Sequence, residues 1–318
     1  MSADWSDMGW DAWGDLGTVR ARLAAGASPD ADIFYGQTAL QLAAERGSPE
    51  VVAALAARSA DVDAVAEGRT ALWSAVYANR ADNARVLAEA GANPWLPMMN
   101  GWPPGRLALA GPTPGLFPRP DGQPGLTDEE SAFVTRARGL IAALADITDD
   151  GHSVTCVAGI DAAEAVRRLE ATPATDEEIE DIYEDPFDDM DEILKVLGVT
   201  DVPGGCVVAQ PWGYGADMPG VQKALSAGTR CYGLYANPKS GNQGSAAVDG
   251  DIVEWDTHPG GGDTDESEPT EEILQAYLLQ GHAEAELCFR AGLLPADSRS
   301  ITGTPDLWVK LPDGDHWS

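Results

Sequence analysis

The chain has 318 residues, of which 44 % are apolar, so length and composition allow two domains with sizeable cores and exclude a largely disordered chain. The formal net charge is −32, and residues 127–318 hold 38 acidic and 11 basic side chains against 14 and 9 in residues 1–126. Such a surface repels the phosphates of nucleic acids and of anionic membranes, so we expect neither as a partner and expect a basic protein instead. Solubility alone would explain the same charge and stays open as an alternative.

The N-terminus is acidic and lacks an apolar run, which argues against a signal peptide. No segment approaches the ~18 apolar residues that a membrane-spanning helix needs, so we expect a cytoplasmic protein. Four cysteines lie in apolar settings without any Cys-x-x-Cys pair, and they predict reduced thiols in the core: Cys156, Cys206, Cys231 and Cys288.

The first 14 residues are dense in tryptophan, which predicts a cap that seals the open end of a repeat array: Trp5, Trp10 and Trp13. Residues 15–27 then predict a helix that ends at Gly26. The sequence Gly-Gln-Thr-Ala-Leu at 36–40 returns as Gly-Arg-Thr-Ala-Leu at 68–72, which is 32 residues later. Narrow alanine-rich faces follow each copy, and they allow successive helix pairs to stack closely.

On these residues the chain resembles the ankyrin-repeat family over about residues 12–110. The pattern is carried by Gly36-x-Thr38-Ala39-Leu40-x-Leu42-Ala43-Ala44, by Gly68-x-Thr70-Ala71-Leu72 and by the closing Gly91-Ala92-Asn93-Pro94. Three residues depart from it: Gln41 and Trp73 stand where the family usually has histidine, and Ser74 stands where a buried leucine is usual.

The resemblance implies a protein–protein interaction module rather than an enzyme, with contacts made by the finger tips and by the inner-helix face. Carried onto this chain, the finger tips are Phe34, Tyr35, Gln37, Glu67, Arg69, Met99, Asn100 and Trp102, and the inner-face positions are Glu45, Arg46, Tyr77 and Ala78. Aromatic and thioether side chains are common at the centres of interfaces. Alternatively, the array folds against the C-terminal part of its own chain, and these residues fill that contact.

Residues 111–126 are rich in proline and glycine and predict either a linker or an ordered, extended crossover. Beyond them, strands interleave with helices. Strands are predicted at 153–158, 205–210 and 229–236, a hairpin at Asp249-Gly250, and helices at 127–146, 161–169, 217–227, 270–279 and 283–294. The expected fold is a short N-terminal ankyrin-repeat α-solenoid (1–110), a linker (111–126) and an acidic α+β domain with a mainly antiparallel sheet (127–318).

The C-terminal part also resembles, more faintly, an uncharacterised actinobacterial domain family. The residues that carry this resemblance are Thr155-Cys156-Val157, Gly159-Ile160-Asp161, the helix Ala165–Leu169, Trp212-Gly213, the turn Leu225–Arg230 and Ala247–Gly250. The resemblance implies no activity.

Residues 176–192 form the densest charge run, with 11 acidic residues and no basic one. This run is either an acidic decoy for a basic protein or a solvated, partly helical segment. In the second case apolar side chains anchor it to the core: Ile179, Ile182, Phe187 and Met190.

We expect no metal and no cofactor. The aspartates of the acidic run lack the glycine and glutamate spacing of a calcium loop: Asp185, Asp188, Asp189 and Asp191. The four histidines show no metal-ligand spacing, and the glycine-rich stretches lack the lysine of a phosphate loop.

Aromatic and basic side chains of the C-terminal part are candidates for lining a pocket, although aromatic residues on strands are more often core: Trp212, Tyr214, Arg230 and Trp255. No catalytic residue is indicated. The function that fits these features is binding of a basic partner protein. This chain would then act as an inhibitor or immunity-type protein. The alternative is an enzyme or small-molecule sensor in the C-terminal domain, with the repeats as its targeting arm.

Overall fold

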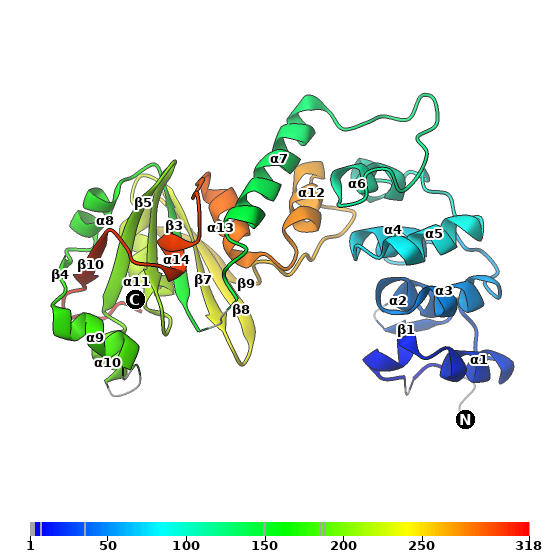
Figure 1. Cartoon of the computed structure of the whole chain (residues 1–318), viewed down its shortest axis with the longest axis horizontal. Helices are drawn as coiled ribbons and strands as arrows, with labels where there is room; N and C mark the ends of the chain where they lie inside the picture. The colour runs from blue at the N-terminus through cyan, green and yellow to red at the C-terminus, as the bar shows by residue number, and fades with distance from the viewer. Residues whose placement is uncertain are drawn as a thin grey trace. The chain divides into compact units, whose positions relative to one another are not determined.

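The structure is a computed structural model, and it describes residues 4–6, 8–34, 36–148, 151–184, 186 and 189–317, without the side chains of Trp10, Asp11 and Phe34. The chain divides into two compact units (Figure 1). The first comprises Met1–Ala132 and Asp263–Leu278, and the second comprises Phe133–Gly262 and Leu279–Ser318. Residues 263–278, which the sequence pattern assigns to the C-terminal domain, therefore pack with the N-terminal repeats.

The first unit is a series of stacked helix pairs, which Figure 1 shows in blue and cyan. Its elements are η1 (Trp10–Gly14), α1 (Leu16–Ala24), β1 (Asp32–Phe34), β2 (Gln37–Thr38), α2 (Ala39–Arg46), α3 (Pro49–Ala56), α4 (Ala71–Tyr77), α5 (Ala81–Glu89), η2 (Met99–Gly101) and α6 (Pro104–Ala110). The helix α12 (Thr270–Leu279) begins in the return segment, as we call residues Asp263–Leu278.

The tryptophan-rich N-terminus packs on the first repeat. The rings of Trp5 and Trp13 lie 5.5 Å apart, and both side chains are buried. The Trp5 Nε1–H donates to the carbonyl of Ser28 over 2.7 Å, which satisfies the indole in the core. These contacts close the open end of the array, as a terminal cap must.

Each repeat starts at a threonine that caps the first helix of its pair. The Oγ1 atoms of Thr38 and Thr70 accept hydrogen bonds from the backbone N–H groups of Gln41 and Trp73, each over 3.2 Å. Threonine satisfies a backbone donor that the first turn of a helix leaves free, so it fixes where the helix begins. Alanines then fill the space between neighbouring pairs, and they are buried: Ala39, Ala43, Ala44, Ala71 and Ala75.

The two residues that depart from the family's histidine have the same role in successive repeats. Gln41 Nε2 donates to the carbonyl of Ala66 over 3.1 Å and to that of Arg69 over 2.7 Å. Trp73 Nε1 donates to the carbonyl of Trp102 over 3.0 Å. Each side chain therefore fastens its own helix to the backbone of the next finger. These bonds fix the position of each repeat relative to the one before it.

We expect Gln41→Ala to lower the free energy of unfolding of the first unit by about 1–3 kcal/mol, because the part-buried carbonyls of Ala66 and Arg69 each lose a side-chain donor and keep only their backbone donor. Urea denaturation gives the total change, and hydrogen–deuterium exchange of residues 64–72 shows whether the next finger loosens. Gln37→Ala is the control, since the side-chain hydrogen bond that Gln37 forms among the described residues stays within its own repeat, to Glu45. Equal effects of the two variants would contradict the fastening role.

The proline-rich stretch 111–126 is an ordered crossover within the first unit, so the second of the two alternatives holds. Trp95 Nε1 donates to the carbonyl of Pro118 over 3.2 Å, and the Phe117 side chain is buried. Arg106 Nη2 forms an ion pair with Glu130 over 2.7 Å, where the chain enters α7 (Asp128–Ala143). The helix α7 begins with the expected capping box between Thr127 and Glu130.

The second unit is built on one eight-stranded antiparallel sheet, in the order β4-β10-β5-β6-β3-β7-β8-β9. The strands are β3 (Ser153–Ala158), β4 (Thr172–Pro173), β5 (Val196–Val202), β6 (Gly205–Gln210), β7 (Arg230–Asn237), β8 (Gly241–Val248), β9 (Asp251–Thr257) and β10 (Leu307–Lys310). The prediction of a helical repeat array followed by an α+β domain with a mainly antiparallel sheet is confirmed.

Helices cover both faces of this sheet. They are α8 (Ala162–Arg168), α9 (Asp176–Glu184), α10 (Met190–Ile193), η3 (Gly215–Asp217), α11 (Pro219–Ser226), α13 (Ala283–Ala291) and α14 (Arg299–Thr302). On one face Val157 of β3 packs in a cluster with Ala165 of α8 and Leu225 of α11. On the other, Cys156 Sγ lies 3.6 Å from Cys288 Sγ of α13. All four cysteines are buried and free, as the sequence predicts.

The acidic run is partly helical and is anchored to the core of the second unit. The Ile182 side chain of α9 is fully buried against Ile193 and Val196. Lys310 of β10 reaches Glu178 over 2.7 Å and Glu192 over 2.8 Å. Hydrogen bonds from Lys195 and Lys310 lower the pKa of Glu192 to about 2.

Two further expected anchors of this run, Ile179 and Met190, are half-buried. Phe187 lies outside the described residues, and so do Asp185 and Asp188. In the described part of the chain, no helix has both the length and the apolar character that crossing a bilayer requires.

Candidate functional site

The first two fingers of the repeat array present polar side chains. Glu67 and Arg46 are exposed, and Gln37, Glu45 and Arg69 are half-buried. The arginine Arg69 stacks 5.5 Å above the ring of Trp73, so packing holds its guanidinium on the finger. Burial raises the pKa of the Glu45 carboxyl, although Gln37 donates to it and Arg69 and Arg46 lie near.

The third finger is buried rather than exposed. Met99 and Trp102 have exposed fractions of 1 % and 0 %, so the expectation that they project from a finger tip does not describe their environment. The Trp102 indole packs under the guanidinium of Arg106, which lies 4.3 Å from the ring. The inner-face residue Tyr77 is also buried, stacked 4.6 Å from Trp73, while its neighbour Ala78 is half-buried.

The return segment covers this third finger. Trp102 Nε1 donates to the carbonyl of Thr270 over 2.9 Å, and the Thr270 hydroxyl donates to the carbonyl of Asn100 over 3.1 Å. Asn100 Nδ2 in turn donates to the carbonyl of Glu268 over 3.0 Å. These bonds bridge about 170 residues of sequence and fix the start of α12 on the repeats.

The return segment also reaches the inner face and the second finger. The Tyr277 ring lies 5.5 Å from that of Tyr77, and its hydroxyl donates to Asn79 Oδ1 over 3.2 Å. Glu266 lies so close to Gly68 that a Cβ there would be 2.8 Å from Glu266 Oε2. Gly68 also has φ of +68°, so glycine is needed there on two grounds. Three of the expected partner-binding residues therefore belong to an intramolecular contact, namely Tyr77, Asn100 and Trp102.

The remaining expected contacts are on the first two fingers and on the inner face of α2. The Phe34 side chain and Tyr35 lie outside the described residues. The outer parts of the first two fingers are thus the candidate partner surface, defined by Gln37, Glu45, Arg46, Glu67 and Arg69.

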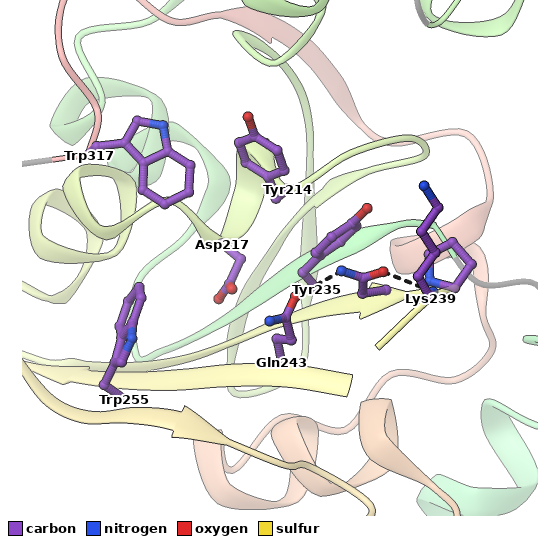
Figure 2. A pocket seen from close by; sticks show the side chains of 9 residues that line it. Tyr214, Asp217, Tyr235, Lys239, Gln243, Trp255 and Trp317 are labelled. Atoms are coloured by element: carbon purple, nitrogen blue, oxygen red, sulfur yellow. Dashed lines mark hydrogen bonds between the residues drawn. The ribbon is translucent and has the colours of Figure 1, made fainter. Parts of the chain in front are cut away.

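The second unit holds a separate cavity of about 710 Å³ (Figure 2). It is lined by Tyr214, Asp217, Tyr235, Asn237, Pro238, Lys239, Gln243, Trp255 and Trp317. These residues come from the loop after β6, from η3, from strands β7, β8 and β9, and from the C-terminal end of the described chain. In Figure 2 the Asp217 carboxylate lies between Trp255 and Gln243, with Tyr214 and Trp317 above it.

The Asp217 side chain is held in place by a hydrogen-bond network beneath the cavity. Gln222 Nε2 donates to Asp217 Oδ1 over 2.6 Å, and the Ser245 hydroxyl donates to the same oxygen over 3.2 Å. Gly233 of β7 leaves the space for this arrangement, since a Cβ there would lie 2.1 Å from Asp217 Oδ1. Both side-chain donors thus reach one oxygen of the carboxylate.

Burial raises the pKa of Asp217 to about 7, against the lowering effect of the bonds from Ser245 and Gln222. No Lys, Arg or His among the described residues forms an ion pair with it. A buried carboxyl without a cationic partner, in a cavity, is a feature typical of functional sites.

Two of the four residues predicted to line a pocket meet in this cavity: Tyr214 and Trp255. Arg230 instead lies beside a shallower hollow with Thr229 and Asp249, and the Trp212 ring packs near Gly151. Asp217 could be recognised in the sequence as a carboxylate between apolar neighbours at the start of a helix, but Trp317 stands in a short tail without a motif.

Among the described residues, no three His, Cys, Asp or Glu side chains cluster in a way that would hold a metal ion. The cavity offers one carboxylate and four aromatic rings, which is a binding chemistry and not a metal centre.

The helix pairs, their 32-residue spacing and their threonine caps are those of one known family. Residues 12–97 match the family model of ankyrin repeats in three copies. Residues 12–97 are ankyrin repeats. Among curated proteins, no sequence matches this chain. Ankyrin repeats are protein–protein interaction modules, and binding to another protein is therefore the function that the first unit indicates.

Proposed function

We propose that the protein acts by binding a basic protein stoichiometrically, in the manner of an inhibitor or immunity protein, through its ankyrin fingers. The observation that carries this proposal is the ankyrin array of residues 12–97, a fold whose repeats offer a continuous binding surface. The inhibitor character rests on analogy with proteins that neutralise a partner by occupying it.

The partner surface is formed by the first two fingers. The return segment already covers the third finger and the neighbouring inner face, through Trp102, Asn100 and Tyr77. What remains outside this contact includes exposed Glu67 and Arg46 and half-buried Gln37, on adjacent repeats. A partner therefore either binds beside the return segment or displaces it.

The charge of the protein supports a basic partner. The first unit holds 23 acidic and 9 basic residues, and the second holds 29 and 11. A negative potential over both units raises the association rate of a cationic protein and lowers that of an anionic one. The potential is screened by salt, so steering by it weakens as ionic strength rises.

We expect Glu67→Lys to slow association with the partner recovered from the host lysate on the order of tenfold at low salt, because it reverses a charge on the exposed finger. Glu89→Lys, on the outer helix α5, is the matched control with the same change of charge. Rates are measured by surface plasmon resonance at ~50 mM and ~500 mM salt.

A difference between the two variants that shrinks at high salt supports the assignment. Equal rates for both variants would place the partner away from the fingers. Binding that is insensitive to salt would show that the partner is not selected by charge.

A second candidate function is a small-molecule sensor in the second unit, with the ankyrin repeats as its targeting arm. The observation that favours it is the cavity with Asp217 and four aromatic side chains. Saturable binding of a small molecule there, with a changed affinity for the partner, would establish it.

A further inference from the structure

The cavity of the second unit has aromatic walls. Tyr214 lies 5.9 Å from Tyr235 and 5.2 Å from Trp317 between ring centroids, and Trp255 stands across the cavity in Figure 2. Trp255 and Trp317 are 58 % and 55 % exposed, an unusual state for the largest apolar side chain. The faces of aromatic rings carry negative potential, and several rings around one space attract a cation.

The polar groups of the cavity favour the same ligand. Asn237 Nδ2 donates to Gln243 Oε1 over 3.0 Å, and Asn237 Oδ1 accepts from the backbone of Lys239 over 2.9 Å. The two amides are therefore largely engaged with each other and with the backbone. Asp217 is the carboxylate among the residues that line the cavity, and Lys239 lies beyond Tyr235 from it in Figure 2.

The combination of aromatic walls with one carboxylate discriminates between cations. A primary ammonium presents three N–H donors and a guanidinium five, which is more than one carboxylate accepts. A quaternary ammonium has no N–H group, so it needs only ring faces and a counter-charge.

We propose that this cavity binds a small quaternary ammonium compound, with the cationic head among Tyr214, Trp255 and Trp317 and its charge balanced by Asp217. The cavity of about 710 Å³ lies within the usual size range of small-molecule sites and exceeds a trimethylammonium head, so the natural ligand carries a further substituent. The site is independent of the ankyrin fingers, since all its residues belong to the second unit.

The affinity should depend on pH, because Asp217 attracts the cation only when it is ionised. The other titratable groups that face the site are Tyr214, Tyr235, Lys239, Cys231 beneath the carboxylate and His316 beside Trp317. Burial raises the pKa values of Tyr235 and of Cys231, so neither ionises near neutral pH. Affinity for the cation therefore rises as pH increases through the pKa of Asp217. The variant Asp217→Asn tests whether Asp217 or another group, such as His316, causes this dependence.

Choline is the probe, and its neutral isostere 3,3-dimethyl-1-butanol is the matched control ligand, since it has the same shape without the charge. Isothermal titration calorimetry on the full-length protein at pH 8 should show choline binding at least about tenfold tighter than the isostere. Asp217→Asn and Trp317→Ala should each weaken choline about tenfold or more. Trp212→Ala, which removes a 40 % exposed tryptophan outside the cavity, should leave it unchanged.

Between pH 5.5 and 8 the choline affinity of the wild type should rise severalfold, and that of Asp217→Asn should stay flat. Equal affinities for choline and the isostere, an unchanged Asp217→Asn, or no saturable binding at tens of millimolar would each overturn the proposal. A pH dependence that persists in Asp217→Asn would show that another group controls the affinity and would overturn the role of Asp217. Circular dichroism of each variant confirms that it is folded, and none of these readouts involves the protein partner.

Discussion

Trp102→Ala is expected to lower the free energy of unfolding of the first unit by about 3–5 kcal/mol, the usual cost of truncating a buried tryptophan. Trp102 is fully buried, and its backbone carbonyl accepts from Trp73. Its indole also donates to Thr270 and packs against Arg106. Truncation therefore opens a cavity and at the same time releases the return segment from the third finger.

Hydrogen–deuterium exchange under increasing urea measures this effect unit by unit, since peptides from residues 71–110 report on the first unit and peptides from β3 and β6 on the second. Trp102→Phe keeps most of the packing and loses the N–H donor, so we expect a smaller cost of about 1–3 kcal/mol. Trp212→Ala is the control for loss of an exposed tryptophan. A change below about 1 kcal/mol for Trp102→Ala would mean that Trp102 is an exposed finger-tip residue after all.

The same burial decides which substitutions can test partner binding. Alanine at Met99 or Trp102 removes core packing, so a lost partner would report a damaged repeat rather than a lost contact. Exposed Glu67 lies on the adjacent finger and can be changed without opening the core. In the return segment, Tyr277→Phe removes the hydrogen bond from the Tyr277 hydroxyl to Asn79.

The repeats could be predicted from the sequence because their signals are local. Thr38 and Thr70 each cap the helix that they begin, and alanines recur at the spacing that close helix packing requires. The Asp249-Gly250 turn likewise joins β8 to β9 as predicted, because both residues adopt the positive φ values that this turn needs, 52° and 88°.

The covering of the third finger could not be predicted, because it depends on contacts distant in sequence. The helix at 270–279 was expected from its cap and apolar face, and α12 has these bounds. An apolar face shows that a helix must pack, but it does not identify the surface that receives it. The position of Trp102 in a loop therefore does not predict whether its side chain is exposed or buried.

The pocket shows the same limit. Trp212 and Trp255 are equivalent candidates by residue type, yet only Trp255 lines the cavity, because β9 at the sheet edge brings it opposite η3. The sequence analysis does not predict the strand β10, because it has only four residues. The path of the tail that carries Trp317 could therefore not be predicted either. Such short segments lack the periodicity from which strands are recognised.

Asp217→Asn is expected to stabilise the second unit at pH 8 and to have less effect at pH 5. Burial raises the pKa of Asp217 to about 7 in the folded protein, from 3.8 for an exposed aspartate. Between pH 3.8 and about pH 7 the Asp217 carboxyl keeps its proton in the folded protein and releases it in the unfolded protein. The stability that the protonated carboxyl contributes is therefore complete below about pH 4, and it is lost as the pH rises to about 7. The loss is on the order of 3 kcal/mol between pH 5 and pH 8, and asparagine, which stays neutral, avoids it.

The measurement is the free energy of unfolding of the second unit from pH 5 to pH 8, with exchange of β3 and β7 peptides as the readout. Asp251→Asn, an exposed residue of β9, controls for removal of one negative charge from an acidic unit. Wild type and Asp251→Asn should lose stability with rising pH, whereas Asp217→Asn should lose less. Parallel profiles for all three proteins would contradict the raised pKa. The Asp217 carboxylate costs stability at neutral pH, and a single substitution could replace it. A ligand that needs its negative charge explains why an aspartate stands at this position.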